Sequence, residues 1–220
     1  MAESKGYTGL SKEETQSIFP VAFDLLRSHY ISKCLSIATK LDIATIIGKT
    51  GHPLSTEEIV QQTGREDVNL DYLQRILRYL STKEIFTEHP GPKFSLTNIS
   101  QLLRTDISGQ FLRSGAAIGS VSAMAPMWDA WGCLEKCVFS KTQKVPFEEA
   151  HGKPFFDYLG ENAELSDEFN FWMTCGTSLD SQKICDIYAQ ELSMLKPETR
   201  FMDVGGGQGD MTLLIFKISH

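Results

Sequence analysis

The sequence lacks a long apolar run and an apolar leader. Its longest uncharged stretch, Ser114 to Trp128, is broken by Gly, Ser and Pro. This stretch is shorter than the roughly 20 apolar residues that a membrane-spanning helix requires, so we expect no transmembrane segment and no membrane partner. Residues 1–6 carry charges and lack the apolar core of a secretory signal. We therefore expect a cytoplasmic protein.

The sequence also has fewer basic than acidic residues, and its number of cysteines is odd. The 220 residues contain 21 Lys and Arg against 28 Asp and Glu, which gives a formal net charge of −7. A strongly basic nucleic-acid-binding protein is thereby disfavoured, because binding phosphates requires the opposite balance. The five cysteines are an odd number in a chain without secretory features, so we expect free, mostly buried thiols. Cys133 and Cys137 have no further Cys or His pair at ligand spacing, and no metal site is predicted.

The composition is that of an ordinary globular protein. Hydrophobic residues make up 41% of the chain and charged residues 22%, which suits one large domain or two small ones. Residues 1–12 are polar and are expected to form a flexible tail. From about Glu13 to Ile47, apolar residues recur at three- and four-residue steps, which is typical of amphipathic helices.

The next segment combines two helices with two strand-like runs. Ser55-Thr-Glu-Glu58 has the spacing of a capping box and predicts a short helix that stops near Gly64. A second helix is predicted from about Val68 to Lys83. Residues 85–87 and 93–96 then read as strands around the turn 89–92. Two helices followed by a two-stranded wing are typical of a winged-helix domain.

The second half begins with helical patterns and ends on a glycine-rich turn. Helices are predicted at about 110–139 and 167–195, with a loop carrying Pro146 and residues 151–154 between them. Arg200 to Val204 is a strand candidate, followed by the glycine cluster 205–209 and a helix over 210–217. A glycine-rich turn between a strand and a helix lets backbone N–H groups approach a nucleotide-like ligand.

The spacing of these glycines separates the turn from two other nucleotide motifs. A P-loop would end in Gly-Lys-Ser/Thr, whereas Gly209 is followed by Asp210 and Met211. The dinucleotide fingerprint Gly-x-Gly-x-x-Gly is not met either. A glycine cluster alone also fits a plain tight turn, so its surroundings must decide between the two.

The glycine cluster and the segments before it together resemble a known protein family. Asp203 to Gly209 matches Asp-Val-Gly-Gly-Gly-x-Gly, the first nucleotide motif of the caffeate-type and hydroxyindole-type family of S-adenosylmethionine-dependent O-methyltransferases. The order of the other parts is similar over most of the chain. These parts are a helix with Trp128 and Trp131, a segment with Gly152, Phe155 and Phe156, and then Phe169, Asn170 and Met173.

The resemblance implies a fold and a function. The fold would be mainly α, with a winged-helix dimerisation domain at residues 13–105. Residues 106–220 would form a helical substrate region and the start of an α/β Rossmann-like methyltransferase domain. The function would be methylation of a hydroxyl on a small aromatic acceptor, with S-adenosyl-L-methionine as cofactor and a homodimer formed through the N-terminal domain.

The resemblance also implies site residues. The cofactor site would comprise Asp203, Gly205, Gly206, Gly207, Gly209 and Thr177. The substrate pocket would comprise Phe156, Phe169, Asn170 and Met173. Independently, Phe169, Met173 and Thr177 follow one another at four-residue steps and so share one helix face. Core packing is the alternative for Phe169 and Met173, and a hydroxyl bonded to its own helix backbone is the alternative for Thr177.

The family's methyltransferase domain continues well beyond this motif, where it supplies a carboxylate for the ribose, an adenine pocket and a histidine general base. Only 17 residues follow Asp203 here. We therefore expect an N-terminal fragment or shortened product with impaired catalysis. The general base would lie beyond the chain end, and none of the five histidines is assigned a catalytic role.

Two other functions remain as alternatives. The chain could act as a non-catalytic dimerisation partner of a full-length methyltransferase, since the elements of residues 13–105 are complete. A winged helix can also read DNA through its second helix. Residues 55–96, however, contain five Lys and Arg against seven Asp and Glu, and phosphate binding needs the reverse.

Overall fold

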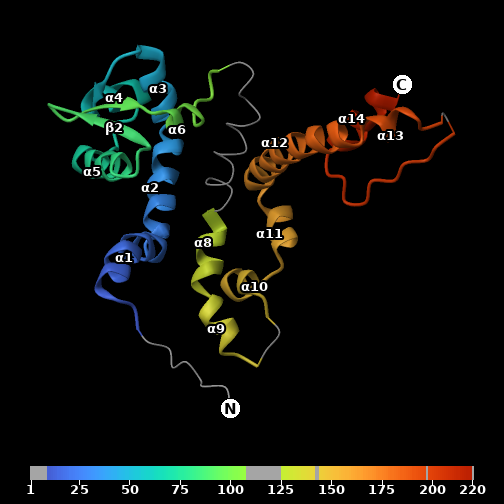
Figure 1. The fold of residues 1–220 in the computed structure, drawn as a ribbon, viewed down its shortest axis with the longest axis horizontal. Helices are drawn as coiled ribbons and strands as arrows, with labels where there is room; N and C mark the ends of the chain where they lie inside the picture. Colours follow the sequence, from blue (N-terminus) through green and yellow to red (C-terminus); the bar gives the residue numbers. More distant parts are fainter. Residues whose placement is uncertain (1–8, 108–124, 142–143, 197, 220) are drawn as a thin grey trace.

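The computed structural model describes residues 9–107, 125–141, 144–196 and 198–219. The described chain is mostly helical and contains one small three-stranded sheet. Figure 1 shows three groups of elements along an elongated molecule. Helices α1–α6 and the sheet lie at one end, α8–α11 follow in the middle, and α12–α14 lie at the other end. Within the described residues, no helix is long and apolar enough to cross a membrane.

Three helices form where amphipathic helices were predicted over residues 13–47. Helix α1 covers Lys12–Leu26, α2 covers Ser28–Lys40 and α3 covers Ile43–Thr50. A capping box between Ser11 and Glu14 fixes the start of α1, so this helix begins at the end of the segment expected to be a flexible tail. Asp42 takes a left-handed conformation with φ 51° and separates α2 from α3.

The predicted capping box at Ser55 is confirmed. The Ser55 N–H donates to Glu58 Oε2 at 2.7 Å, and the Glu58 N–H donates to Ser55 Oγ at 3.3 Å. Helix α4, Thr56–Thr63, then ends at Gly64, whose φ of 67° suits glycine. Helix α5, Leu70–Ser81, begins after Asn69, which caps it through its side chain.

The predicted hairpin is also confirmed. Strand β2, Phe86–His89, pairs antiparallel with β3, Lys93–Leu96, and Phe86 lies opposite Leu96. A third strand, β1, Leu54–Ser55, adds to the other side of β3, so the order is β1-β3-β2. The sequence pattern missed β1 because two residues are too few to show alternation. Helix α6, Asn98–Gln101, follows the sheet.

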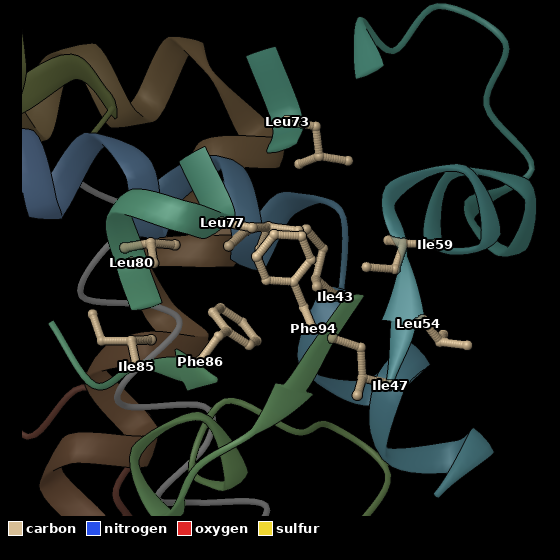
Figure 2. Close-up of a cluster of buried hydrophobic side chains, with 11 residues drawn as sticks. Ile43, Ile47, Leu54, Ile59, Leu73, Leu77, Leu80, Ile85, Phe86 and Phe94 are labelled. Atoms are coloured by element: carbon tan, nitrogen blue, oxygen red, sulfur yellow. The ribbon is translucent and has the colours of Figure 1, made fainter. Parts of the chain in front are cut away.

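One apolar core joins these helices to the sheet. It is formed by side chains from α2, α3, α4, α5 and the strands, and Figure 2 shows them gathered around the rings of Phe86 and Phe94. The buried members are Ala38, Ile43, Ile47, Leu54, Ile59, Leu73, Leu77, Leu80, Ile85, Phe86 and Phe94. Because this core draws on every element from α2 to β3, residues 28–96 behave as one packed unit.

The middle group contradicts one prediction. Residues 146–151 were expected in a loop, yet they form helix α10, Pro146–His151. Proline is favoured at the first helical position, where its missing N–H has no partner to lose, and Gly152 ends the helix with φ 74°. The neighbouring helices are α8, Ala125–Gly132, α9, Leu134–Val138, and α11, Phe155–Glu161. The first part of the helix expected over 110–139 lies outside the described residues.

The middle group, α8–α11, contacts α2, and its helices also contact one another. Lys33 Nζ of α2 lies 4.2 Å from the ring centroid of Trp128 on α8, a cation–π geometry. His151 of α10 hydrogen-bonds through Nε2 to the carbonyl oxygen of Pro126 at 2.8 Å, and its ring packs between Phe147 and Tyr158. These contacts position α8 beside both α2 and α10.

The last group is built on one long helix. Helix α12, Ala163–Ile187, has 25 residues, and α13 covers Ala189–Ser193. Helix α14, Asp210–Ser219, follows the glycines as predicted and packs along α12. Cys175 and Cys185 of α12 and Ile215 of α14 are buried.

The strand predicted at residues 200–204 does not form. This segment has no strand pairing, and Met202 and Val204 are 83% and 87% exposed. A strand needs a neighbouring strand to take up its backbone hydrogen bonds, and the described residues place none beside it. The apolar pattern therefore identified a segment suited to a sheet, while the structure leaves it as irregular chain.

The core predicts a clear difference between two leucines of α5. Leu77 is fully buried, whereas Leu70 is 39% exposed. We expect Leu77→Ala to lower the free energy of unfolding by about 2–5 kcal/mol because it leaves a cavity. The matched change Leu70→Ala should cost about 0.5 kcal/mol or less. Urea unfolding followed by circular dichroism measures both, and equal losses would contradict a core centred on Leu77.

An ion pair between α5 and β2 predicts a pH dependence. The hydrogen bonds from the Arg78 guanidinium, at 2.7–3.1 Å, hold the pKa of Glu88 below its ordinary value. A lowered carboxyl pKa contributes stability above the unfolded pKa, and this is lost as pH falls through the folded pKa. Glu88→Gln should therefore destabilise at neutral pH, with the difference closing in acid. Glu66→Gln, at an exposed site, should show neither effect.

Candidate functional site

A cleft of about 350 Å³ lies between α11, α12 and the glycine loop before α14. The residues that line it come from two stretches of chain more than twenty residues apart. They are Phe156, Phe169, Asn170, Met173, Thr174, Thr177, Asp203, Gly205, Gly206, Gly207, Gln208 and Met211. All of the sequence-predicted site residues except Gly209 are in this set, so the structure brings the expected cofactor and substrate residues together.

The glycine loop has a backbone that requires glycine at alternate positions. Gly205, Gly207 and Gly209 have φ values of 76°, 56° and 82°, in the left-handed region that other residues rarely adopt. The Gly209 N–H donates to the Gly206 carbonyl at 2.8 Å and closes the turn, and the Gly209 carbonyl accepts from Leu213 N–H of α14. Gly209 therefore shapes the loop and starts the helix without lining the cleft.

At Gly206, glycine is needed for lack of space and not for its φ value. The Asp203 carboxylate lies so close to its Cα that an added Cβ would collide with it. By contrast, a Cβ on Gly205 or Gly207 would meet no atom within 4 Å. The loop is therefore packed against Asp203 on one side, while Gly205 and Gly207 face open space that a ligand can approach.

A hydrogen bond from helix α14 also holds the Asp203 side chain in place. Thr212 Oγ1, in the first turn of α14, donates a hydrogen bond to Asp203 Oδ2 at 2.9 Å. Asp203 is the one ionisable residue among those that line the cleft. The electrostatics of this part of the cleft therefore favour a ligand that brings a positive charge next to the loop.

Aromatic side chains form the opposite wall. The ring of Phe169 lies 5.1 Å from Phe155 and 5.7 Å from Trp172, both edge to face, and Phe155 packs in turn on Phe156. Phe156 is 75% exposed and Met173 is 45% exposed. Core packing therefore accounts for part of Phe169 but not for Phe156 or Met173, which present apolar surface to the cleft.

The remaining polar residues complete this wall. Thr177 lines the cleft, and within the described residues its hydroxyl makes no hydrogen bond to its own helix backbone. Thr174, Gln208 and Met211 were not predicted. Thr174 lies four residues after Asn170, so extending the helical spacing that selected residues 169, 173 and 177 would have found it.

No histidine or cysteine in the described part of the chain lines the cleft. His151 and His89 hydrogen-bond to the Pro126 carbonyl and the Ser95 hydroxyl, and His220 lies outside the described part. All five cysteines are free thiols, two buried and three half-buried, and burial raises the pKa of Cys34 and Cys185. The described residues contain no group of three or more metal-ligating side chains.

Comparison with known families identifies both halves of the chain. Residues 23–106 match the O-methyltransferase dimerisation domain, and residues 131–218 match the O-methyltransferase domain. The chain belongs to the O-methyltransferase family. The glycine loop and the wall residues of the cleft all fall within the second matched segment.

The chain is also similar to individual O-methyltransferases in sequence and in structure. The chain is 29% identical over 195 residues to (R,S)-reticuline 7-O-methyltransferase of Papaver somniferum, a match that covers 84% of this chain and 53% of that protein. The mitomycin 7-O-methyltransferase structure superposes with a TM-score of 0.74 at 18% identity, covering 94% of this chain and 57% of that one.

A second similar structure holds ligands. It is an O-methyltransferase from neocarzinostatin biosynthesis in complex with S-adenosylmethionine and 2-hydroxy-5-methyl naphthoic acid, with a TM-score of 0.61 and 23% identity. The match covers 86% of this chain and 54% of that one. The present chain thus spans about half the length of the O-methyltransferases it matches.

The left-handed glycines predict a local loss of stability on substitution. Gly205→Ala places a Cβ on a residue with φ 76°, which costs about 1–2 kcal/mol. We expect the free energy of opening at residues 205–213 to fall by this amount in native-state hydrogen exchange. Gly132→Ala is the control, because its Cβ meets open space at an ordinary φ. Unchanged exchange in Gly205→Ala would show that the loop does not hold this conformation.

Proposed function

We propose that the chain binds S-adenosyl-L-methionine in this cleft as part of an O-methyltransferase that methylates a hydroxyl of a small aromatic acceptor. The observation that carries the proposal is the juxtaposition of the glycine loop with the aromatic wall in one cleft. S-adenosylmethionine supplies the methyl group from its sulfonium. The similar enzymes are named for aromatic acceptors, which supports the acceptor class.

The cleft residues fit such a cofactor. Gly205 and Gly207 leave their backbone open to close approach, since no atom lies within 4 Å of the Cβ positions they lack. The Asp203 carboxylate offers an acceptor for the ammonium group at the amino-acid end. Thr177 and Gln208 add hydrogen-bonding groups beside the loop. We therefore assign Asp203, Gly205, Gly206, Gly207, Gly209 and Thr177 to the cofactor site, with Gly209 acting through the loop conformation.

The aromatic wall fits the acceptor. Phe156, Phe169 and Met173 provide apolar surface against which a planar ring can stack, and the Asn170 amide can orient a polar substituent. Methyl transfer needs the acceptor oxygen in line with the sulfonium methyl and a base for the hydroxyl proton. The lining residues supply positioning, and Asp203 is the one ionisable group among them. We assign no general base to the described residues.

We also propose that the N-terminal half pairs two copies of the chain. Residues 23–106 match a domain described as a dimerisation domain. At the start of this segment and just before it, Phe19, Val21 and Leu25 of α1 are 60–71% exposed. Apolar surface of this kind on one helix favours protein contacts. A winged-helix arrangement of α4, α5 and the β2–β3 hairpin would then serve as a scaffold for dimerisation.

Ion pairs of the basic residues in 55–96 disfavour the alternative function, DNA binding by the winged-helix arrangement. Every Lys and Arg in residues 55–96 lies within 4 Å of a carboxylate. The pairs are Arg65–Asp67, Arg75–Asp71, Arg78–Glu88, Lys83–Asp24 and Lys93–Glu58. This surface therefore offers little uncompensated positive charge to phosphates. The five free thiols favour a reducing compartment, so we propose the cytoplasm.

Calorimetric titration of S-adenosylmethionine and S-adenosylhomocysteine into the purified chain tests the proposal. We expect saturable binding of both, with Kd on the order of micromolar, and a dimeric mass by sedimentation. Asp203→Asn should weaken binding roughly tenfold because it removes the charge that faces the ammonium group. Asp129→Asn, at an exposed position of α8, should not change the affinity. Absence of binding by the unmodified chain would refute the cofactor assignment.

A further inference from the structure

The hydrogen bond from Thr212 to Asp203 crosses the glycine loop. Thr212 is the third residue of α14, and its Oγ1 lies 2.9 Å from Asp203 Oδ2. The glycine motif does not include this residue, and Thr212 does not line the cleft. The bond therefore connects a cleft residue to a helix that starts on the far side of the loop.

The backbone around Asp203 offers little other restraint. Residues 200–204 form no strand, and the neighbours Met202 and Val204 are among the most exposed apolar residues of the described chain. The Asp203 carboxylate accepts the hydrogen bond from the Thr212 hydroxyl and occupies the space that a Cβ at Gly206 would need. Asp203 Oδ1 has no hydrogen-bond partner within the described part of the chain.

We propose that Thr212 is a positioning residue for cofactor binding. Its hydroxyl holds Oδ2 and so turns Oδ1 of the same carboxylate toward the ammonium group at the amino-acid end of the cofactor. A carboxylate held in advance binds a cation more tightly, because no rotamer freedom is lost on binding. This inference rests on the proposed function, since it assigns a partner to the residue that faces the cofactor.

A purely structural role for Thr212 makes different predictions. If the hydroxyl only stabilised the start of α14, its loss would loosen the helix and weaken every cleft ligand alike. If it positions Asp203, its loss should weaken only ligands that carry the amino-acid end. Thr212→Val keeps the shape and removes the hydroxyl, and Thr212→Ser keeps the hydroxyl. Thr82→Val is the matched control, because the Thr82 hydroxyl bonds only to the Tyr79 carbonyl of its own helix.

The test is calorimetric titration of the four proteins with two probes, S-adenosylhomocysteine and 5′-methylthioadenosine, which lacks the amino-acid end. We expect Thr212→Val to weaken S-adenosylhomocysteine roughly ten- to hundredfold, the range for a lost hydrogen bond to a charged group. Binding by Thr212→Ser should stay within about threefold of the unmodified chain. Methylthioadenosine should bind all four proteins equally.

Hydrogen exchange adds a readout that needs no ligand. We expect faster exchange at residues 203–206 in Thr212→Val than in Thr212→Ser, with equal exchange of the two variants over α14, and no change in Thr82→Val. Equal affinities for S-adenosylhomocysteine in Thr212→Val and Thr212→Ser would overturn the positioning role, as would equal weakening of both probes by Thr212→Val. If the unmodified chain binds neither probe, the proposed function fails and this role fails with it. Exchange then shows separately whether Thr212 restrains Asp203.

Discussion

The packing of α14 along α12 is the contact on which the candidate site depends. The aromatic wall belongs to α11 and α12, and the glycine loop is attached to the start of α14. Cys175 and Cys185 on α12 and Ile215 on α14 are buried. Removing apolar surface from water is the main force available to hold two helices together. The cleft exists because this packing holds two distant stretches of chain against each other.

The N-terminal half is organised by a different constraint, the shared core around Phe86 and Phe94. Helices α1, α4 and α6 begin at capping boxes, α3 and α4 end at left-handed glycines, and the hairpin pairs in register. Local signals and tertiary packing agree there at each level, which is the condition for a sequence to specify one structure. This half is therefore a packed unit of its own, and the cleft lies at the other end of the molecule.

The segment around Asp203 has an unusual backbone conformation, and few contacts hold it in place. Three left-handed glycines define the loop, whereas the residues before it lack strand pairing. The side chain of Asp203 consequently depends on the Thr212 hydroxyl and on the space left by Gly206. A loop of this kind gains its geometry from a few directed contacts, so its conformation is sensitive to single atoms that contribute little to global stability.

The sequence by itself determined the features that rest on short-range physics. The cap at Ser55, the end of α4 at Gly64 and the turn between β2 and β3 involve partners only a few residues apart. The four-residue spacing of Phe169, Met173 and Thr177 placed them on one helix face for the same reason. The glycine motif identified a loop that requires left-handed residues, because φ preferences are local.

Only the tertiary structure decided which of these segments meet. It turned the expected loop at Pro146 into helix α10, and it left residues 200–204 without the neighbouring strand that pairing requires. It also set Thr212 against Asp203 and added Gln208 to the cleft, contacts that no periodic pattern encodes. Local sequence favours particular backbone conformations and side-chain directions, whereas a cleft forms where separate elements pack, and that depends on the whole chain.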